Sequence, residues 1–243
     1  MISTVIAGSN RILSSLPGEE RRAVDAQSEN CEFESGAVLH EVGEKLQYVY
    51  FPLSSLMSML SVMENGSAVE VGSVGREGMA GVHMVLSVDR ISTRTICQIP
   101  GWARRMAADA FGELFANNPT FRRLLQRYTM AVFNVAAQSV ACNRLHPLTE
   151  RCAKWLLNSQ DRIGTHEFSL THEFLAMMLG VRRPGVSIAA ATLQNAGLIR
   201  YSRGHVTILD RLGLEAASCE CHRVTTQEYE RLMRIPIVAP SAN

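Results

Sequence analysis

Two adjacent arginines, Arg182 and Arg183, have the chemistry needed to read a DNA base. A guanidinium can donate two hydrogen bonds to one guanine in the major groove. Pro184 follows them directly, and proline is tolerated in the first turn of a helix but not deeper. We therefore expect a helix from about Arg183 to Asn195, with the arginine pair at its beginning.

The residues around this expected helix have the spacing of a helix-turn-helix. Within the segment THEFLAMMLGVRRPGVSIAAATLQNAGLI, residues 171–199, the small Ala176, the turn residue Gly180 and the apolar Val186 are four and then six residues apart. The unit needs a small residue where its helices cross and an apolar residue that locks the second helix. Glycine can end the first helix in a left-handed conformation at little cost. The alternative is a generic helical hairpin with a solvated arginine pair.

The next residues favour the helix-turn-helix over that alternative. Two short runs, 197–201 and 205–209, flank Ser202–Gly204, and this pattern predicts a β-hairpin. A helix-turn-helix followed by a hairpin is a winged helix. Arg200 and Arg203 would give the hairpin phosphate contacts, which position a protein on DNA without reading its sequence, and we group Ser202 with them.

A long helix is expected before this unit, because residues 120–146 contain neither glycine nor proline. Apolar and small residues recur there at alternating spacings of four and three, as in a helix that pairs with another helix. We favour a parallel homodimer, although a helix packed on its own domain would show the same spacing. His146–Pro147 then breaks the helix and forms the hinge, and residues 151–158 are expected to form a short amphipathic helix. The predicted dimer positions are Phe121, Leu125, Tyr128, Val132, Val135, Ser139 and Cys142.

Short strands separated by glycine turns are expected between residues 31 and 107, which suggests a sandwich, barrel or jelly roll. The apolar runs are Val38–Leu39, Tyr48–Phe51, Leu56–Met63, Val69–Val74, Met79–Leu86 and Thr95–Ile99.

The composition is that of an ordinary globular protein: 243 residues, 47% hydrophobic, with a net charge of +1. Residues 1–143 contain 12 Lys and Arg against 14 Asp and Glu, whereas residues 144–243 contain 12 against 9. The basic half is therefore the one with the predicted winged helix. The beginning of the chain does not resemble a secretory signal, so we expect a cytoplasmic protein with reduced thiols.

No catalytic motif is apparent in the sequence, so we expect no enzyme. The six cysteines are scattered, which argues against an iron–sulfur cluster. Cys219 and Cys221, with the adjacent His222, have the residue types of a metal site, but we expect them to be ordinary residues of a C-terminal helix. We accordingly expect no metal and no cofactor.

The winged helix, with its Gly-Leu-Ile, its Arg-Gly and the following Asp210–Arg211, resembles the Crp–Fnr superfamily of bacterial regulators. The resemblance implies an α+β fold: an N-terminal jelly-roll-like β-roll sensor in residues 1–116, a long dimerisation helix and hinge in 117–146, and a winged helix-turn-helix in 147–243. It implies a transcription regulator that binds double-stranded DNA as a homodimer, with one recognition helix per half-site. RNA polymerase and a small-molecule effector are further partners that it implies. The alternative function is a ligand-sensing module whose helix-turn-helix mediates protein contacts.

The resemblance also implies further site residues. Ser187 matches the exposed face of the recognition helix, and Thr171 matches a phosphate-contacting position. Pro184 and Ile188 depart from the family pattern, so the DNA site it reads is left open. The effector pocket would use Gly75, Glu77, Gly78 and Arg94. The arginine lies too far along the chain for the family's phosphate position, and we expect no cyclic AMP binding.

Overall fold

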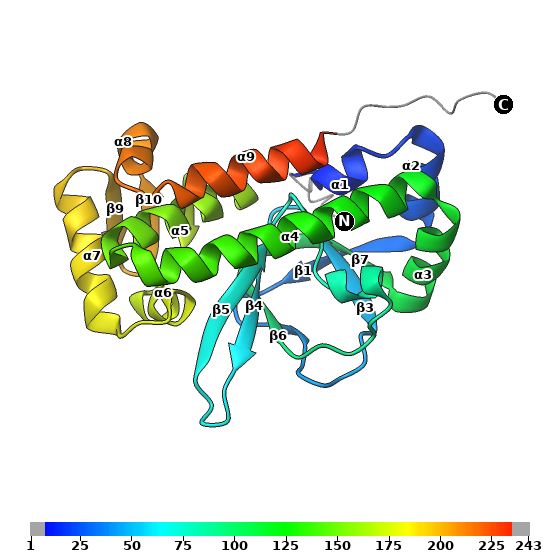
Figure 1. Cartoon of the computed structure of the whole chain (residues 1–243), viewed down its shortest axis with the longest axis horizontal. Helices are drawn as coiled ribbons and strands as arrows, with labels where there is room; N and C mark the ends of the chain where they lie inside the picture. Colours follow the sequence, from blue (N-terminus) through cyan, green and yellow to red (C-terminus); the bar gives the residue numbers. More distant parts are fainter. Residues whose placement is uncertain (1–7, 235–243) are drawn as a thin grey trace, which may run out of the picture.

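The computed structural model describes residues 8–234. Its N-terminal half contains two antiparallel sheets that form the predicted β-roll (Figure 1). The three-stranded sheet has the order β1 (Ser28–Phe33), β7 (Gly101–Ala107), β3 (Tyr48–Pro52). The four-stranded sheet has the order β2 (Val38–His40), β6 (Arg94–Ile99), β4 (Leu56–Val62), β5 (Ala68–Val74).

One of the predicted strands is wrong. The apolar run Met79–Leu86 contains a 3-10 helix, η1 (Val82–Leu86), in place of a strand. Gly81 before it and Ser87 after it have φ angles of 91° and 59°. These left-handed residues turn the chain on both sides, and an extended strand cannot continue through such turns. Apolar composition alone does not distinguish the two structures in so short a run.

Short helices pack at one end of the β-roll and close a core of large apolar side chains. They are α1 (Arg11–Ser14), α2 (Gly18–Ala26) and α3 (Ala108–Asn117). Phe51 of β3, Phe111 of α3 and Phe121 meet in this core with ring centroids about 6 Å apart. The core therefore joins the roll to the beginning of the long helix.

The predicted long helix is α4 (Pro119–Leu145), with 27 residues and a length of about 40 Å. Its N-terminal proline needs no hydrogen-bond partner for the missing N–H, which suits the first helical position. His146 is extended and Pro147 precedes α5 (Leu148–Ile163), so the break falls where the sequence predicted it. The helix α5 extends beyond the expected residues 151–158 at both ends. Gly164, which has a φ of 81°, directly follows its last residue.

The winged helix follows α5. It contains the helix pair α6 (His172–Leu179) and α7 (Arg183–Asn195), and a three-stranded sheet of order β8 (Glu167–Ser169), β10 (His205–Ile208), β9 (Ile199–Ser202). The helix α7 has the predicted bounds, with the proline in its first turn. The strands β9 and β10 form the predicted wing, to which β8 adds an edge strand.

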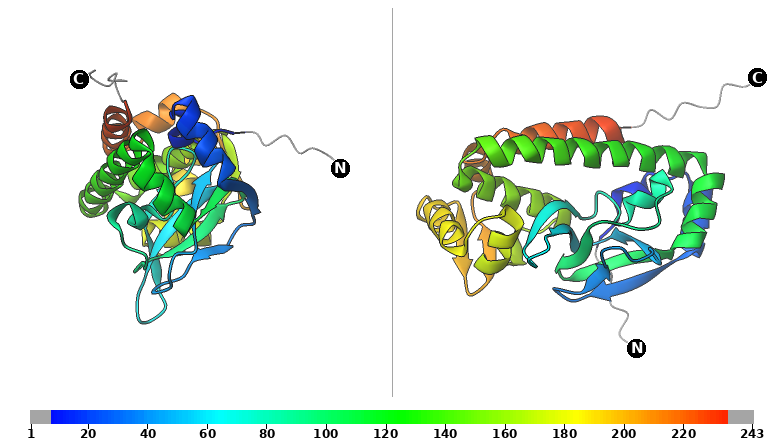
Figure 2. Two further views of the ribbon diagram at one scale, coloured as in Figure 1. Left: turned by 90° about the vertical axis from the view of Figure 1, so that its right-hand side faces the viewer. Right: turned by 60° about the horizontal axis from the view of Figure 1, so that its bottom comes forward.

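The chain then returns to the long helix. After α8 (Arg211–Ala216), the helix α9 (Cys221–Met233) runs alongside α4, as both Figure 1 and the right view of Figure 2 show. Asn134 of α4 donates a hydrogen bond to Glu228 of α9 at 2.8 Å. The predicted domain of residues 147–243 therefore contains a segment that packs on the preceding helix and not within the winged helix.

The β-roll and the winged helix share one hydrophobic core. Leu60 of β4 and Ile96 of β6 belong to the same buried cluster as Trp155 of α5 and Val186 of α7. Gly180 of the helix-turn-helix also lies against Val69 of β5, since a Cβ there would be 3.0 Å from its side chain. The two parts thus pack directly on one another in this conformation. No single helix in residues 8–234 is long and apolar enough to cross a membrane.

Candidate nucleic-acid interface

The helices α6 and α7 cross at 106°, within the range of a helix-turn-helix. Ala176 and Val186 are both buried where the helices meet. Gly180 ends α6 with a φ of 63°, and the N–H of Val181 donates to the carbonyl of Ala176 at 3.0 Å. The three residues therefore have the roles that their spacing predicted. A left-handed glycine ends the first helix while satisfying one of its free carbonyls.

The arginine pair stands exposed at the beginning of α7. Arg182 is the extended residue just before the helix, and Arg183 is its first residue. The Nε of Arg183 lies 3.6 Å from a carboxylate oxygen of Glu173 on α6, but both side chains are more than half exposed. An ion pair of that kind contributes little in water, so the guanidinium is available to exchange partners.

Thr171 and Ser187 are both engaged within the winged helix. The Thr171 hydroxyl accepts a hydrogen bond from the N–H of Phe174 at 3.1 Å and so caps α6. The Ser187 hydroxyl donates to the Arg183 carbonyl at 3.2 Å and lies 3.0 Å from Nδ1 of His172. Thr171 is exposed and Ser187 is half-buried, so neither residue is closed off from the solvent side.

His172 is a positioning residue that the sequence did not single out. Its ring contacts the ring of Tyr201 with centroids 4.4 Å apart, and its Nδ1 faces Ser187. It therefore links α6, α7 and the wing. Tyr201 in turn donates its hydroxyl hydrogen to the carbonyl of Leu170 at 2.6 Å. The only hint in the sequence was the place of this histidine directly after the capping Thr171.

The turn of the wing is Arg203–Gly204, because Ser202 pairs with His205 across the hairpin. Both turn residues have positive φ, 48° and 79°, as a type I′ turn requires. Arg200, Ser202 and Arg203 are all exposed. Among the ion pairs of residues 8–234, none involves Arg182, Arg200 or Arg203. These three cations can therefore meet phosphates without first losing an acidic partner.

The exposed face of α7 continues beyond the arginines. Ile188 is 69% exposed, and Ala191 and Thr192 are exposed one turn further on. An apolar side chain in that position suits contact with a thymine methyl group. The face thus offers two cations followed by apolar and small residues.

The predicted effector residues are only partly brought together. Gly75, Glu77 and Gly78 form a turn that is closed from two sides. A Cβ on Gly75 would lie 2.4 Å from Arg162 of α5, and one on Gly78 would overlap the ring of Tyr128. Glu77 is already bonded, accepting from the Gly75 N–H and from Arg162.

Arg94 does not join this turn. It lies on β6 and forms an ion pair with Glu41 at 2.7 Å. The prediction that it completes the same pocket is therefore corrected, because this partner holds it at the β2 edge of the four-stranded sheet. The Glu77 turn faces instead a cavity of about 340 Å³ between β5, α4, α5 and α9. Arg11, Arg76, Arg211 and Tyr229 are among its lining residues.

The predicted dimer positions point mostly into the chain's own core. Phe121, Leu125 and Tyr128 are at most 2% exposed and belong to the β-roll core, and Cys142 is 1% exposed. These four positions are corrected, because a side chain already buried within one chain offers no surface to a second copy. The other three predicted positions, Val132, Val135 and Ser139, are half-buried.

A second stripe with the same spacing is exposed on α4. Met130, Phe133, Ala137 and Val140 follow one another at intervals of three, four and three residues, and Phe133 and Val140 are 66% and 73% exposed. Such alternation is the pattern of a helix that pairs with another helix. The seam predicted from the sequence and this exposed stripe lie on nearly opposite faces of one helix, about 150° apart at 3.6 residues per turn, and spacing alone cannot tell which face is buried.

The comparisons with known proteins agree with this architecture. Residues 150–217 match the family described as the Crp-like helix-turn-helix domain. This segment contains α5, the helix pair, the wing and α8. No curated protein matches the chain.

Solved structures of similar fold cover most of the chain. A Crp/Fnr-family regulator from Eubacterium rectale, 17% identical, aligns over 87% of this chain and 97% of its own, with a TM-score of 0.64. FixK2 from Bradyrhizobium japonicum, 15% identical, aligns over 79% of this chain and 98% of its own, with a TM-score of 0.68. At such identities the likeness establishes the fold. The chain thus carries a Crp-like helix-turn-helix domain and has the fold of the Crp–Fnr superfamily of transcription regulators, as its sequence predicted.

Proposed function

We propose that this protein is a sequence-specific DNA-binding transcription regulator. The observation that carries the proposal is the beginning of α7, where Arg182 and Arg183 stand exposed at the end of the helix that enters the major groove in this fold. Arg200 and Arg203 of the wing are exposed cations suited to phosphate contacts. Base reading is thus assigned to α7, and positioning on the backbone to the wing and Thr171.

We infer that the protein acts as a homodimer through the exposed stripe Met130, Phe133, Ala137 and Val140. Two α4 helices in parallel would bury these side chains against one another, which supports the inference because large apolar side chains are otherwise left in water. A parallel pair also relates two recognition helices by a two-fold axis. The expected DNA site is therefore a near-palindrome with one α7 per half-site.

Control by a signal is the third part of the proposal. The cavity beside Glu77 is lined by residues of the β-roll, α4, α5 and α9, so its occupant would contact each of these parts. The Arg162–Glu77 pair connects the cavity to α5, which leads into the winged helix. A ligand that displaces this pair would change how the winged helix packs on the β-roll, and would bias the position of α7.

The test is DNA binding by the purified protein at a site found by genome-wide mapping of bound fragments. Replacing Arg183 by alanine should weaken binding by about 1–3 kcal/mol and relax the preference at one base position. Arg223→Ala is the matched control, because this exposed arginine of α9 lies outside the winged helix. Unchanged affinity and preference in Arg183→Ala would contradict the base-reading assignment.

The same experiment distinguishes the alternative function. A helix-turn-helix that serves protein contacts would show no enriched DNA sequence in the mapping. Any loss of DNA affinity with rising salt would then be the same with and without the wing arginines. If the wing arginines contact phosphates, each arginine that is removed should reduce the slope of log affinity against log salt concentration by about one.

A further inference from the structure

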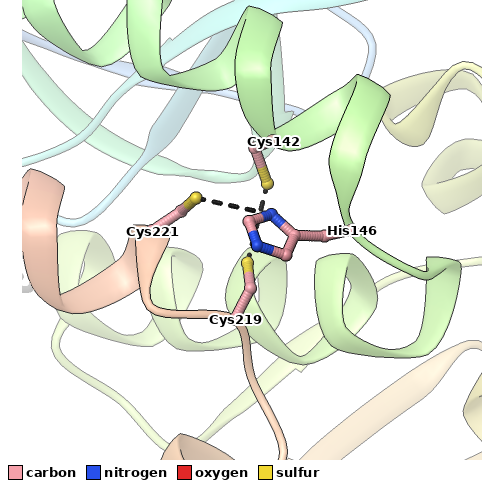
Figure 3. Close-up of side chains that lie close together, drawn as sticks. All are labelled: Cys142, His146, Cys219 and Cys221. Carbon is pink, nitrogen blue, oxygen red and sulfur yellow. Dashed lines mark hydrogen bonds between the residues drawn. The ribbon is translucent and has the colours of Figure 1, made fainter.

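Four metal-ligating side chains converge where the long helix ends. Cys142 lies in the last turn of α4, and His146 is the residue directly after that helix. Cys219 and Cys221 come from the segment that leads into α9. Their ligand atoms all lie within 4.8 Å of one another (Figure 3). The cluster joins residues that are more than 70 positions apart in the sequence.

Two of the distances between these atoms are close to those of a tetrahedral metal site. The sulfurs of Cys142 and Cys219 are 3.6 Å apart, and the Cys221 sulfur is 3.6 Å from Nδ1 of His146. For Zn²⁺, bonds of about 2.3 Å to sulfur and 2.0 Å to nitrogen at the tetrahedral angle separate two sulfurs by about 3.8 Å, and a sulfur and a nitrogen by about 3.5 Å. The four donors would therefore need only small shifts to hold one ion.

The surroundings of the donors also resemble those of a metal site. Each of the three cysteines is at most 3% exposed, and together they form a separate small buried cluster. The other ring nitrogen of His146, Nε2, lies 3.1 Å from a carboxylate oxygen of Glu220. The side-chain amide of Gln138 donates to the Cys221 sulfur at 3.1 Å. Metal-ligating histidines commonly donate their second N–H to a carboxylate, which fixes the ring for the metal.

We propose that Cys142, His146, Cys219 and Cys221 bind one Zn²⁺ in a tetrahedral site with three sulfur ligands and one nitrogen ligand. Three thiolates and an imidazole are a donor set that Zn²⁺ commonly takes in closed structural sites. His222, the neighbour of Cys221, is not part of the set, because its Nε2 is 2.9 Å from Asp161. This proposal departs from the expectation that Cys219 and Cys221 are ordinary residues of a C-terminal helix.

A disulfide between Cys142 and Cys219 is the competing use of these sulfurs. It would need the sulfurs to approach to about 2.05 Å, and it would leave Cys221 and His146 unused. Zn²⁺ uses all four donors, including the imidazole that Glu220 already orients. This is why we favour the metal.

Binding would connect three segments at the hinge. The site joins the end of α4, the break before α5 and the beginning of α9. Since the unfolded chain does not hold these residues together, metal binding would stabilise the packing of α9 on α4. The role expected for the ion is therefore structural, at the point where the winged helix joins the long helix.

The experiment uses the full chain, purified with its thiols reduced and then measured for zinc by elemental mass spectrometry. We expect one zinc per chain. After removal of the ion, titration with Co²⁺ should give the strong visible absorption of tetrahedral cobalt and a thiolate-to-cobalt charge-transfer band, and Zn²⁺ should abolish both. Cys219→Ser and His146→Gln should lose this binding, whereas Cys31→Ser, which changes a cysteine outside the cluster, should keep it.

A second variant keeps the test decisive if the ligand variants fail to fold. Glu220→Gln keeps all four ligands but weakens the orientation of His146, and loss of such an outer partner typically lowers metal affinity roughly 10–100-fold. Three results would overturn the proposal: no stoichiometric zinc or cobalt binding by the natural sequence, unchanged binding in a folded Cys219→Ser variant, or a Cys142–Cys219 disulfide found by mass spectrometry in protein freshly purified without a reductant.

Discussion

The guanidinium of Arg162 on α5 donates a hydrogen bond to the carboxylate of Glu77 in the β-roll, with Nε and Oε1 3.0 Å apart. Its Nη1 also donates to Ser73 of β5 at 2.7 Å. Burial by itself would lower the pKa of Arg162, but the carboxylates of Glu77 and Glu70 outweigh this effect and raise it. The charged pair therefore stabilises the contact between the helix that leads into the winged helix and the Gly75–Gly78 turn of the β-roll.

Replacing Glu77 by glutamine should destabilise the protein by about 1–3 kcal/mol, because a mostly buried guanidinium loses its counter-charge. Urea unfolding followed by circular dichroism would measure the loss. The matched control is Glu29→Gln, since Glu29 pairs with Arg105 but is 64% exposed. The control should cost less than about 1 kcal/mol. Equal losses in the two variants would show that burial of the Arg162 pair contributes nothing.

The same turn should not bind cyclic AMP. Arg162 and Tyr128 fill the space beside Gly75 and Gly78, and the Glu77 carboxylate already has partners. Arg94 is held by Glu41, away from this turn. A phosphate in the adjoining cavity would meet Arg162 already paired with Glu77, and taking over that cation would leave the mostly buried carboxylate without its counter-charge. Calorimetric titration with cyclic AMP should therefore give no heat of binding at micromolar concentrations, and a clear isotherm would contradict this account of the turn.

The winged helix could be predicted from the sequence because its signals are local. Pro184 can stand only in the first turn of a helix, so it marks the beginning of α7. Gly180 readily takes the left-handed conformation that ends α6. Each of these residues specifies a backbone conformation within a few positions. Their spacing therefore predicted the elements and their bounds without knowledge of the remaining chain.

The buried face of the long helix and the cysteine cluster could not be predicted in the same way. The face of α4 with Phe121 and the face with Phe133 have the same alternating spacing, and only the packing of the β-roll decides which one is buried. Cys142 and Cys219 are 77 positions apart in the sequence. They meet because α9 returns along α4, and no local pattern near residue 221 specifies that return.

Aspartate in place of Phe133 should produce monomers. The change puts a charge in the centre of the exposed stripe on α4, where a second copy would have to bury it without a partner. Sedimentation velocity would measure the state of assembly. Leu212→Asp is the matched control, because Leu212 is 78% exposed on α8 and away from the stripe. A stable dimer in the Phe133 variant, or loss of the dimer in both, would contradict the assigned interface.

His40 should make the stability of the protein depend on pH near neutrality. Burial lowers the pKa of His40 below its ordinary value, with a smaller contribution from His83. Its Nδ1 has no hydrogen-bond partner among residues 8–234, and its Nε2 lies 2.9 Å from the carbonyl of Tyr48. Below about pH 6.5 the unfolded chain takes up a proton that the folded chain resists, so stability falls as the pH is lowered through this range.

The pH effect is checked by comparing urea unfolding of the natural sequence and of His40→Gln between about pH 5 and 8. Glutamine retains a donor for Tyr48 but does not titrate. The variant should lose stability less steeply on acidification, with the two curves converging toward low pH. Parallel curves would show that His40 does not contribute to the pH dependence.

Arg203 occupies a backbone conformation that suits asparagine or glycine better than arginine. Its φ of 48° falls in the left-handed region, at the first position of the type I′ turn of the wing. Arg203→Asn should therefore stabilise the protein by about 0.5–1 kcal/mol while weakening DNA binding and lowering its salt slope by about one. Arg200→Ala, in the adjacent strand, should weaken DNA binding without the gain in stability. Thermal unfolding and fluorescence anisotropy at several salt concentrations separate the two effects, and a variant that gains stability but binds DNA unchanged would remove Arg203 from the proposed interface.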